Sequence, residues 1–211
     1  SVSNYPPIGQ LEWPLNSRYT FDSFVVGPCN DLAYSGAQSV ASHPGKTYNP
    51  LFIYSDVGLG KTHLLQAIGH QCEEAGRSFI YVTGEQFTNE YIFSIQSRTT
   101  NDFRNKYRTP DVLLIDDIQF ISGKEQTQEG FFHTFNDLHS SGRQLILSSD
   151  RPPTALAPLA DRLRSRFESG LMVDMQPPDL ETRLAILSTK AREHNIDPPS
   201  DILEAIAKTA K

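Results

Sequence analysis

The sequence predicts an α/β fold in which a parallel β-sheet is covered by helices on both faces. Four short runs of three or four apolar residues are separated by longer stretches with helical periodicity. Runs that are apolar throughout are typical of strands buried on both faces, as in a parallel sheet. Alternation of such strands with helices favours helical layers on both sides of the sheet. The predicted strands are residues 51–54, 79–82, 112–115 and 145–147.

The helices are predicted from apolar residues that recur on one face. Such a face is present over residues 62–75 and in the stretch after Gly123. The apolar positions are Leu64, Leu65, Ile68 and Cys72 in the first stretch, and Phe131, Phe135 and Leu138 in the second. From residue 178 onward the patterns are helical only, with Asp179 and Ser200 as suitable N-caps. We expect this last part to form a small helical subdomain.

The length of 211 residues suits one domain with an appendage. We expect a linker over residues 1–18, because three prolines and a glycine interrupt regular structure there. A core is expected over 19–176 and a helical subdomain over 177–211. The two methionines, Met172 and Met175, come late, which favours a piece of a longer protein.

The composition is that of an ordinary globular protein, with 38% apolar residues, 21% charged residues and a net charge of −6. The sequence lacks the domain-wide positive charge of most nucleic-acid-binding domains, so nucleic-acid contact would depend on a local patch. Cys29 and Cys72 are too few for a disulfide framework or a zinc site, which makes a reducing cytoplasm the expected location. The sequence shows no signal peptide and no apolar run approaching the roughly 18 residues of a membrane span.

A candidate phosphate loop follows the first predicted strand and opens a helix. Residues 55–62, Ser-Asp-Val-Gly-Leu-Gly-Lys-Thr, meet the pattern Gly-x-x-x-x-Gly-Lys-Ser/Thr except at the first position. Backbone N–H groups at a helix N-terminus bind phosphate oxygens, Lys61 would reach the β- and γ-phosphates, and the Thr62 hydroxyl would hold Mg²⁺. We expect Ser55 to weaken binding if its φ is positive, and Asp56 to add unfavourable negative charge. The alternative is a glycine-rich turn without a ligand.

Two acidic residues end the third predicted strand. A hydrophobic strand that ends in acids, here Asp116 and Asp117, is the usual partner of a phosphate loop. Asp116 would hold Mg²⁺ through water, and Asp117 would orient or activate the attacking water. The alternative is a surface turn after a strand, and the phosphate loop makes that alternative weaker.

The fourth predicted strand ends in polar residues 148–151, and an arginine-rich stretch follows. Carboxyl ends of neighbouring parallel strands meet at one crevice, so a polar group there can sense the γ-phosphate or position water. Arg162 and Arg166 are four residues apart and can share a helix face. An arginine of a P-loop protein can reach the ATP of a neighbouring subunit. The alternative is a solvated face held by salt bridges.

Five segments carry motifs that occur together in one order. They are Asn-Pro-Leu-Phe-Ile-Tyr at 49–54, Val-Gly-Leu-Gly-Lys-Thr-His-Leu at 57–64, Leu-Leu-Ile-Asp-Asp-Ile-Gln-Phe at 113–120, Phe-Phe-His-Thr-Phe-Asn at 131–136 and Ser-Asp-Arg-Pro-Pro at 149–153. Together they resemble the bacterial DnaA family of AAA+ chromosomal replication initiators. Residues 19–27 resemble the family's lead-in segment, and 177–183 resemble the start of its lid. The resemblance covers about residues 19–200.

The resemblance implies a five-stranded parallel αβα core with a helical lid, and residues that bind ATP or ADP. Those residues are Val25, Val26, Gly58, Leu59, Gly60, Lys61, Thr62 and His63. It also implies that Thr62 and Asp116 hold Mg²⁺. Asp117, Asp150 and Arg166 would act in hydrolysis, Asp150 as a sensor of the γ-phosphate and Arg166 as a finger toward the ATP of the adjacent protomer.

A local basic segment is the candidate for single-stranded DNA. Residues 98–108 hold four basic residues and one acidic residue, a local charge of +3, with Phe103 and Tyr107 interleaved. Cations there could contact phosphates of a single strand, in the region where the family's initiator-specific element would lie. The candidate contacts are Ile92, Arg98 and Lys124. The alternative is a solvated helix face.

The resemblance further implies partners, and the sequence also departs from the family pattern in two places. ATP-bound initiators assemble with copies of themselves into a helical filament on single-stranded origin DNA. Duplex DNA would be bound through a C-terminal domain absent from this chain, and the replicative helicase and acidic phospholipids would be partners of the full-length protein. The chain ends before the lid helix that carries the family's second arginine sensor, and Ser55-Asp56 stands where the family usually has Gly-Gly.

The function expected from these observations is an ATP-switched assembly module of a replication initiator, with slow hydrolysis as the off switch. A helicase loader or an initiator-inactivating paralogue is an alternative within the same class. A P-loop enzyme that phosphorylates a small molecule is an alternative from another class. The arginine-rich stretch and the helical subdomain argue against that enzyme.

Overall fold

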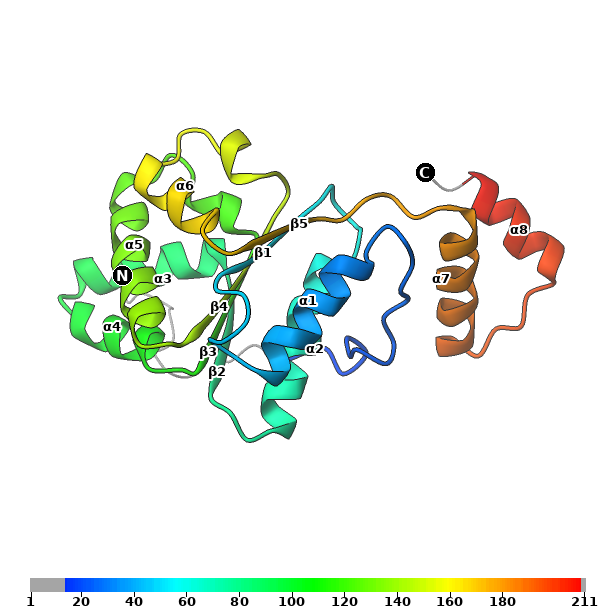
Figure 1. Cartoon of the computed structure of the whole chain (residues 1–211), viewed down its shortest axis with the longest axis horizontal. Helices are drawn as coiled ribbons and strands as arrows, with labels where there is room; N and C mark the ends of the chain where they lie inside the picture. The colour runs from blue at the N-terminus through cyan, green and yellow to red at the C-terminus, as the bar shows by residue number, and fades with distance from the viewer. Residues whose placement is uncertain (1–13, 210–211) are drawn as a thin grey trace, which may run out of the picture.

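A five-stranded parallel sheet forms the centre of the fold (Figure 1). The computed structural model describes residues 14–209, so residues 1–13 of the expected linker lie outside the described part. The strands are β1 (Leu51–Tyr54), β2 (Phe79–Thr83), β3 (Val112–Asp116), β4 (Gln144–Ser149) and β5 (Leu171–Asp174). They pair in the order β2-β3-β4-β1-β5, and every pairing is parallel. The predicted α/β class is confirmed.

The fifth strand was implied by the family resemblance but not found from the apolar runs. β5 lies at the edge of the sheet and alternates between exposed Met172 and Asp174 and buried Val173. Four residues with one fully buried side chain carry too little apolar signal to stand out in a sequence. The four predicted apolar runs are all strands: β1 has the predicted bounds, β2 and β3 each extend by one residue at the carboxyl end, and β4 extends by one residue before the run and two after it.

Helices cover both faces of the sheet (Figure 1). They are α1 (Asp31–Ser42), α2 (Lys61–Glu74), α3 (Gly84–Gln96), α4 (Thr100–Arg108), α5 (Glu125–Ser140), α6 (Asp161–Phe167), α7 (Leu180–Glu193) and α8 (Ser200–Thr209), with short 3₁₀ turns η1 (Ile118–Ile121) and η2 (Pro153–Ala155). In one core cluster, Leu51 and Ile53 of β1 pack with side chains of α1 and α2. In the other, Phe52 packs with side chains of the four helices α3, α4, α5 and α6. Successive residues of β1 therefore point to opposite cores, which explains why the run is apolar throughout.

A pair of helices, α7 and α8, lies beside the αβα core and packs together (Figure 1). The Asp179 side chain accepts a hydrogen bond from Thr182 N at 2.8 Å, as expected of an N-cap. Ser200 is the first residue of α8 rather than the residue before it, so the N-cap prediction there is wrong by one position. We propose the boundary between core 19–176 and helical part 177–211 in the connection before Leu180. None of the helices within 14–209 is long and apolar enough to cross a membrane.

We expect Phe87→Ala to lower the free energy of unfolding by about 3–5 kcal/mol, as truncation of a buried phenylalanine usually does. Phe87 is fully buried, and its ring contacts Phe103, Tyr107 and Phe131 edge to face at centroid distances of 5.2, 4.9 and 5.4 Å. Urea unfolding followed by circular dichroism measures the change. Phe120→Ala is the control, because Phe120 is 45% exposed and should cost roughly 1 kcal/mol or less. Equal losses for the two variants would contradict the importance of this cluster.

Candidate functional site

The loop between β1 and α2 has the backbone geometry of a phosphate-binding turn. Gly58 and Gly60 have φ of 86° and 101°, in the left-handed region that residues with side chains rarely adopt. Gly60 is the N-cap of α2, so the first N–H groups of this helix face the loop. A helix N-terminus with free N–H groups attracts anions.

Lys61 is held inside this loop by three oxygen atoms. Its Nζ donates to Ser55 O at 2.8 Å, to Asp56 O at 2.9 Å and to Ser55 Oγ at 3.1 Å. The residue is only 7% exposed. Burial lowers the pKa of Lys61, and the nearby carboxylates of Asp117 and Asp116 partly offset the fall.

Ser55 fits the first loop position without backbone strain. Among residues 14–209, the residues other than glycine with positive φ are Arg98, Asp117 and Asn195, so Ser55 has an ordinary backbone conformation. The condition for a φ penalty at Ser55, a positive φ, is therefore not met. Its hydroxyl instead donates to Asp56 O at 2.8 Å and accepts from Lys61.

Asp116, at the end of β3, is a buried carboxylate that accepts hydrogen bonds from three hydroxyl groups. Its Oδ2 accepts from Thr62 Oγ1 at 2.7 Å and from Tyr81 OH at 2.8 Å, and its Oδ1 accepts from Ser148 Oγ. The structure therefore places Thr62 and Asp116, the two predicted Mg²⁺ ligands, side by side. Tyr81 was not foreseen, because it lies inside the apolar run of β2 and carries no sequence signal of its own.

Asp117 has an unusual backbone conformation at the turn after β3. Its φ and ψ are 56° and 53°, and its N–H donates to Ser148 Oγ at 2.8 Å. Its Oδ1 accepts from Gln119 Nε2 at 3.0 Å, while Gln119 Oε1 accepts from Asp150 N at 3.3 Å. Gln119, another residue that sequence reasoning missed, thus connects the ends of β3 and β4.

Asp150 lies at the same edge of the sheet, and its carboxylate forms two hydrogen bonds with Arg151, both of 2.8 Å. These bonds hold the pKa of Asp150 below its usual value. The charges of Asp116, Asp117 and Asp150 all act on Lys61. The ends of β3 and β4 therefore converge on the phosphate loop, as a parallel sheet requires.

The His63 side chain contacts the lead-in segment, residues 19–27. Its Nε2 lies 2.7 Å from Thr20 O, and its ring stacks on Tyr19 at 4.9 Å and meets Phe24 edge to face at 5.1 Å. Burial lowers the pKa of His63, so the ring is expected to be neutral near pH 7. His63 therefore attaches the lead-in to the start of α2.

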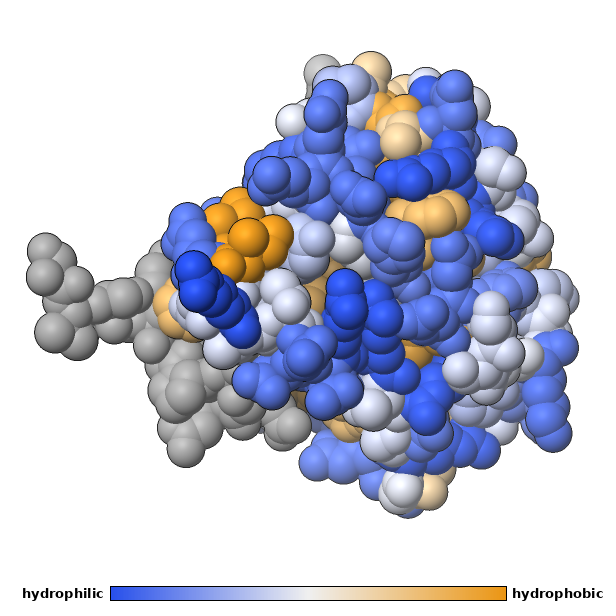
Figure 2. All heavy atoms as spheres, turned by 90° about the vertical axis from the view of Figure 1, so that its left-hand side faces the viewer, coloured by the Kyte–Doolittle hydropathy of each residue, from blue (hydrophilic) through white to orange (hydrophobic). Residues whose placement is uncertain are grey.

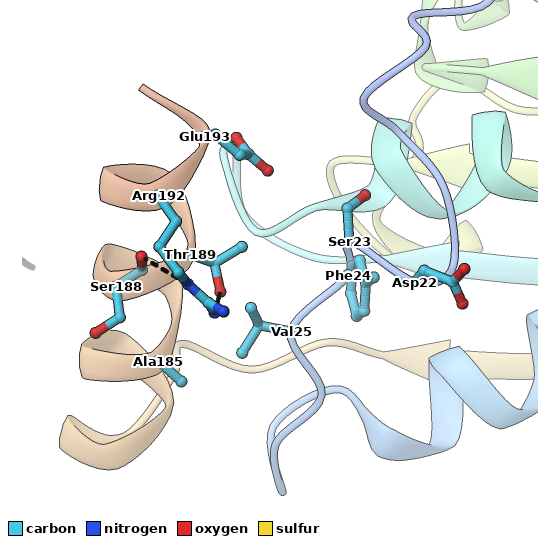
Figure 3. Close-up of a pocket in the computed structure, with 9 residues that line it drawn as sticks. All are labelled: Asp22, Ser23, Phe24, Val25, Ala185, Ser188, Thr189, Arg192 and Glu193. Carbon is cyan, nitrogen blue, oxygen red and sulfur yellow. Dashed lines mark hydrogen bonds between the residues drawn. The ribbon is translucent and has the colours of Figure 1, made fainter. Parts of the chain in front are cut away.

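A cavity of about 520 Å³ separates the lead-in from α7 (Figure 3). Asp22, Ser23, Phe24 and Val25 line one side, and Ala185, Ser188, Thr189, Arg192 and Glu193 line the other. Phe24 also reaches the phosphate loop, since a Cβ added to Gly60 would lie 3.0 Å from its ring. Val26 is 45% exposed and lies outside this lining. Gly27 packs so closely on Thr182 of α7 that any side chain there would overlap it.

The three arginines of α6 have different surroundings. Arg162 lies over the ring of Phe132, with 4.6 Å from its guanidinium carbon to the ring centroid, and Arg164 pairs with Asp161 at 3.1 Å. Arg166 is half-buried, and within the described part of the chain its guanidinium forms no ion pair. The salt bridge of the alternative interpretation, a solvated face held by salt bridges, is present at Arg164, and the finger role of Arg166 stays a prediction.

The predicted basic segment is smaller in the structure than in the sequence. Lys106 pairs with Glu90 at 2.9 Å and Arg108 pairs with Asp137, so these two cations are engaged within the molecule. Phe103 and Tyr107 are 2% and 0% exposed, which rules out base stacking on them. The interpretation of residues 98–108 as one aromatic and basic patch is therefore wrong.

The three candidate DNA contacts, Ile92, Arg98 and Lys124, are exposed on the surface. Ile92 is 39% exposed, and Arg98, Arg104 and Lys124 are exposed. Figure 2 shows the face of the molecule formed by the helices on the left of Figure 1; it is largely hydrophilic, with a compact apolar patch.

Comparisons with known proteins give a consistent result. A family model described as the bacterial DnaA ATPase domain matches residues 15–174. The chromosomal replication initiator protein DnaA of Thermomicrobium roseum is 60% identical over 199 residues, covering 93% of this chain and 43% of that protein. The chain thus spans less than half of the length of this curated relative.

Solved structures show the same likeness. Domain III of the Thermotoga maritima replication initiation protein DnaA has a TM-score of 0.89 and 48% identity, covering 92% of this chain and 82% of that one. A replication initiator DnaA bound to AMPPCP and single-stranded DNA has a TM-score of 0.89 and 42% identity, covering 93% of this chain and 61% of that one.

Proposed function

The chain belongs to the bacterial DnaA ATPase-domain family, and on that premise we propose that it is an ATP-binding module that switches the assembly of a replication initiator on origin DNA. The observation that carries this proposal is the cluster at the carboxyl end of the sheet. Lys61 lies in a loop with the backbone of a phosphate site, and the Thr62 hydroxyl meets the Asp116 carboxylate beside it. The solved relative that holds AMPPCP supports an adenine nucleotide as the ligand.

ATP or ADP would bind with its phosphates along residues 58–63 and its base toward the cavity lined by Val25. The backbone N–H groups of this loop and Lys61 supply the positive charge that phosphates need. The cavity is apolar at Phe24, Val25 and Ala185 and polar at Thr189, a lining that suits a purine.

Mg²⁺ fits the residues present. Within the described part of the chain no three His, Cys, Asp or Glu side chains gather into a metal site, so the protein offers an incomplete oxygen set. Thr62 and Asp116 would hold the ion directly or through water, and the nucleotide phosphates would complete its coordination. When bound, the ion would neutralise charge on the phosphates.

The groups around Asp117 support slow hydrolysis as an off switch. Its carboxylate would orient the attacking water, and Gln119 and the Ser148 hydroxyl hold the residue in place. Asp150, directly after the neighbouring strand β4, would respond to the γ-phosphate. Its ion pair with Arg151 keeps this carboxylate charged.

We expect Arg166→Ala to leave ATP affinity within about twofold while impairing ATP-dependent assembly, because the arginine would act on the nucleotide of an adjacent protomer. Calorimetry measures the affinity and light scattering measures the assembly. Arg164→Ala is the matched control, since Arg164 already pairs with Asp161 on its own helix. Unchanged assembly of the Arg166 variant would remove it from the finger role.

Single-stranded origin DNA is the nucleic acid that we propose for this domain, with Ile92, Arg98 and Lys124 as contacts. The relative whose structure includes single-stranded DNA supports this partner. Copies of the chain itself would be the second partner, in a helical assembly. Duplex DNA, the replicative helicase and acidic phospholipids are proposed as partners of a full-length initiator in the cytoplasm.

ATP turnover distinguishes this function from the alternatives. An assembly switch hydrolyses ATP without an acceptor, at a rate per protomer that rises with protein concentration. Turnover that requires an added small-molecule acceptor would contradict it and favour a phosphotransferase. A helicase loader or an initiator-inactivating paralogue shares the same site, and assembly on single-stranded origin DNA without another initiator would argue against both.

A further inference from the structure

We propose that the Ser55 hydroxyl competes with the nucleotide phosphates for Lys61 and thereby lowers the affinity of this site for ATP and ADP. The proposal rests on the nucleotide-binding function proposed above and assigns a role to the position at which this chain departs from the phosphate-loop pattern. Ser55 is thus an affinity-determining residue.

All three protons of the Lys61 ammonium are engaged by the loop. An ammonium has three N–H donors and no acceptor. Here they go to Ser55 O at 2.8 Å, Asp56 O at 2.9 Å and Ser55 Oγ at 3.1 Å. Lys61 and Ser55 are 7% and 3% exposed, so water does not readily replace these acceptors.

The hydroxyl contact is the one that depends on the side chain at position 55. The two carbonyl oxygens belong to the backbone and are present whatever residue stands there. Ser55 Oγ also donates its own proton to Asp56 O at 2.8 Å, which leaves only its lone pairs for Lys61. It can therefore accept from the ammonium but cannot donate to a phosphate without losing this bond.

A phosphate oxygen that contacts Lys61 must take over one of its three protons. The hydroxyl contact is the longest of the three and is made to a weaker acceptor than a carbonyl oxygen, so it is the one that yields. Exchange of a buried hydrogen bond of this kind changes affinity by a factor of about 3 to 10. The cost should appear only with ligands whose β- or γ-phosphate reaches Lys61.

Two substitutions separate this mechanism from a backbone effect. Ser55→Ala removes the hydroxyl and keeps an ordinary side-chain residue, whereas Ser55→Gly also frees the backbone. Because Ser55 does not have positive φ, the freedom of glycine should add little. We therefore expect both variants to bind ATP and ADP about 3 to 10 times more tightly than the unchanged chain.

Calorimetry with ATP, ADP and AMP tests the proposal. The gain should be present for ATP and ADP and absent for AMP, and Ser140→Ala, at the exposed end of α5, should change none of the affinities. Unchanged or weaker ATP binding by Ser55→Ala, or a gain confined to Ser55→Gly, would overturn the role of the hydroxyl while leaving the nucleotide function intact. Absence of ATP binding in all three forms would overturn the nucleotide function, and this proposal with it.

Discussion

Replacement of Lys61 by alanine is expected to lower ATP affinity by at least about 100-fold, so that ATP binding is lost at the concentrations at which the unchanged chain is saturated. Lys61 is the buried cation at the centre of the phosphate loop, and a charge-assisted hydrogen bond to a phosphate contributes about 1.5–3 kcal/mol. The α2 N-terminus alone supplies much less positive charge. Isothermal calorimetry with ATP measures the loss.

Lys46→Ala provides the control for this experiment. Lys46 is exposed and lies in the segment before β1, at the other end of that strand from the phosphate loop. Its replacement changes the net charge by the same amount as Lys61→Ala but removes no group from the phosphate loop. ATP affinity should stay within twofold of that of the unchanged chain. Equal ATP affinity for Lys61→Ala and the unchanged chain would refute the assignment of residues 55–62 as the phosphate site. Circular dichroism of both variants checks that each is folded.

The parts of the fold that could be predicted are those whose residues form a recognisable pattern within a short stretch of sequence. Continuous apolar runs identified β1, β2, β3 and β4. β5 was missed because its residues alternate between exposed Met172 and Asp174 and buried Val173, which resembles a loop in a short window. The other edge strand, β2, was found because its run at residues 79–82 is apolar throughout. α1 was missed for a related reason: its buried face consists of alanines, a glycine and one valine, which are weak apolar signals.

The site could be predicted where its residues are adjacent in the sequence, and less well where it depends on contacts across the sheet. The order of Gly58, Gly60 and Lys61 identified the phosphate loop directly. Tyr81 and Gln119 acquire their roles only when parallel strands bring β2, β3 and β4 together. Tyr81 lies in an apolar run, and Gln119 lies within the motif at 113–120 without any signal that its amide would connect two strand ends. The surroundings of a side chain, not its type, decide its role at these positions.

For the basic segment, residues 98–108, the sequence predicted a binding surface that contacts across the fold partly remove. Counting charges over residues 98–108 gave a positive patch, but ion pairs with Glu90 and Asp137, both distant in the sequence, engage half of it. Burial of Phe103 and Tyr107 follows from the packing of α4 on α3 and α5. A local charge therefore indicates a binding surface only when its partners across the fold are known.

The second large effect is expected at Asp117. Asp117→Asn should reduce ATP hydrolysis by about 10²- to 10⁴-fold, the range usual for loss of a group that accepts or directs a proton. Asparagine has the same shape and tolerates the left-handed backbone conformation of this residue, so the turn after β3 should persist. Its side-chain oxygen can still accept from Gln119, which leaves the hydrogen-bond network in place. Phosphate release at saturating ATP, measured in a single turnover, gives the rate.

ATP affinity separates this effect from a structural one, because Asp117→Asn should bind ATP as tightly as the unchanged chain or more tightly. The substitution removes a negative charge beside the phosphates and beside Lys61, on which Asp117 exerts the largest carboxylate effect. Asp102→Asn is the control, since Asp102 is exposed on α4 and should change neither affinity nor rate. Weakened binding together with slow hydrolysis would mean that Asp117 stabilises the site as a whole. Unchanged hydrolysis would mean that another group directs the water. Asp150, directly after β4, would be the next candidate, because Gln119 hydrogen-bonds both the Asp117 carboxylate and the Asp150 N–H.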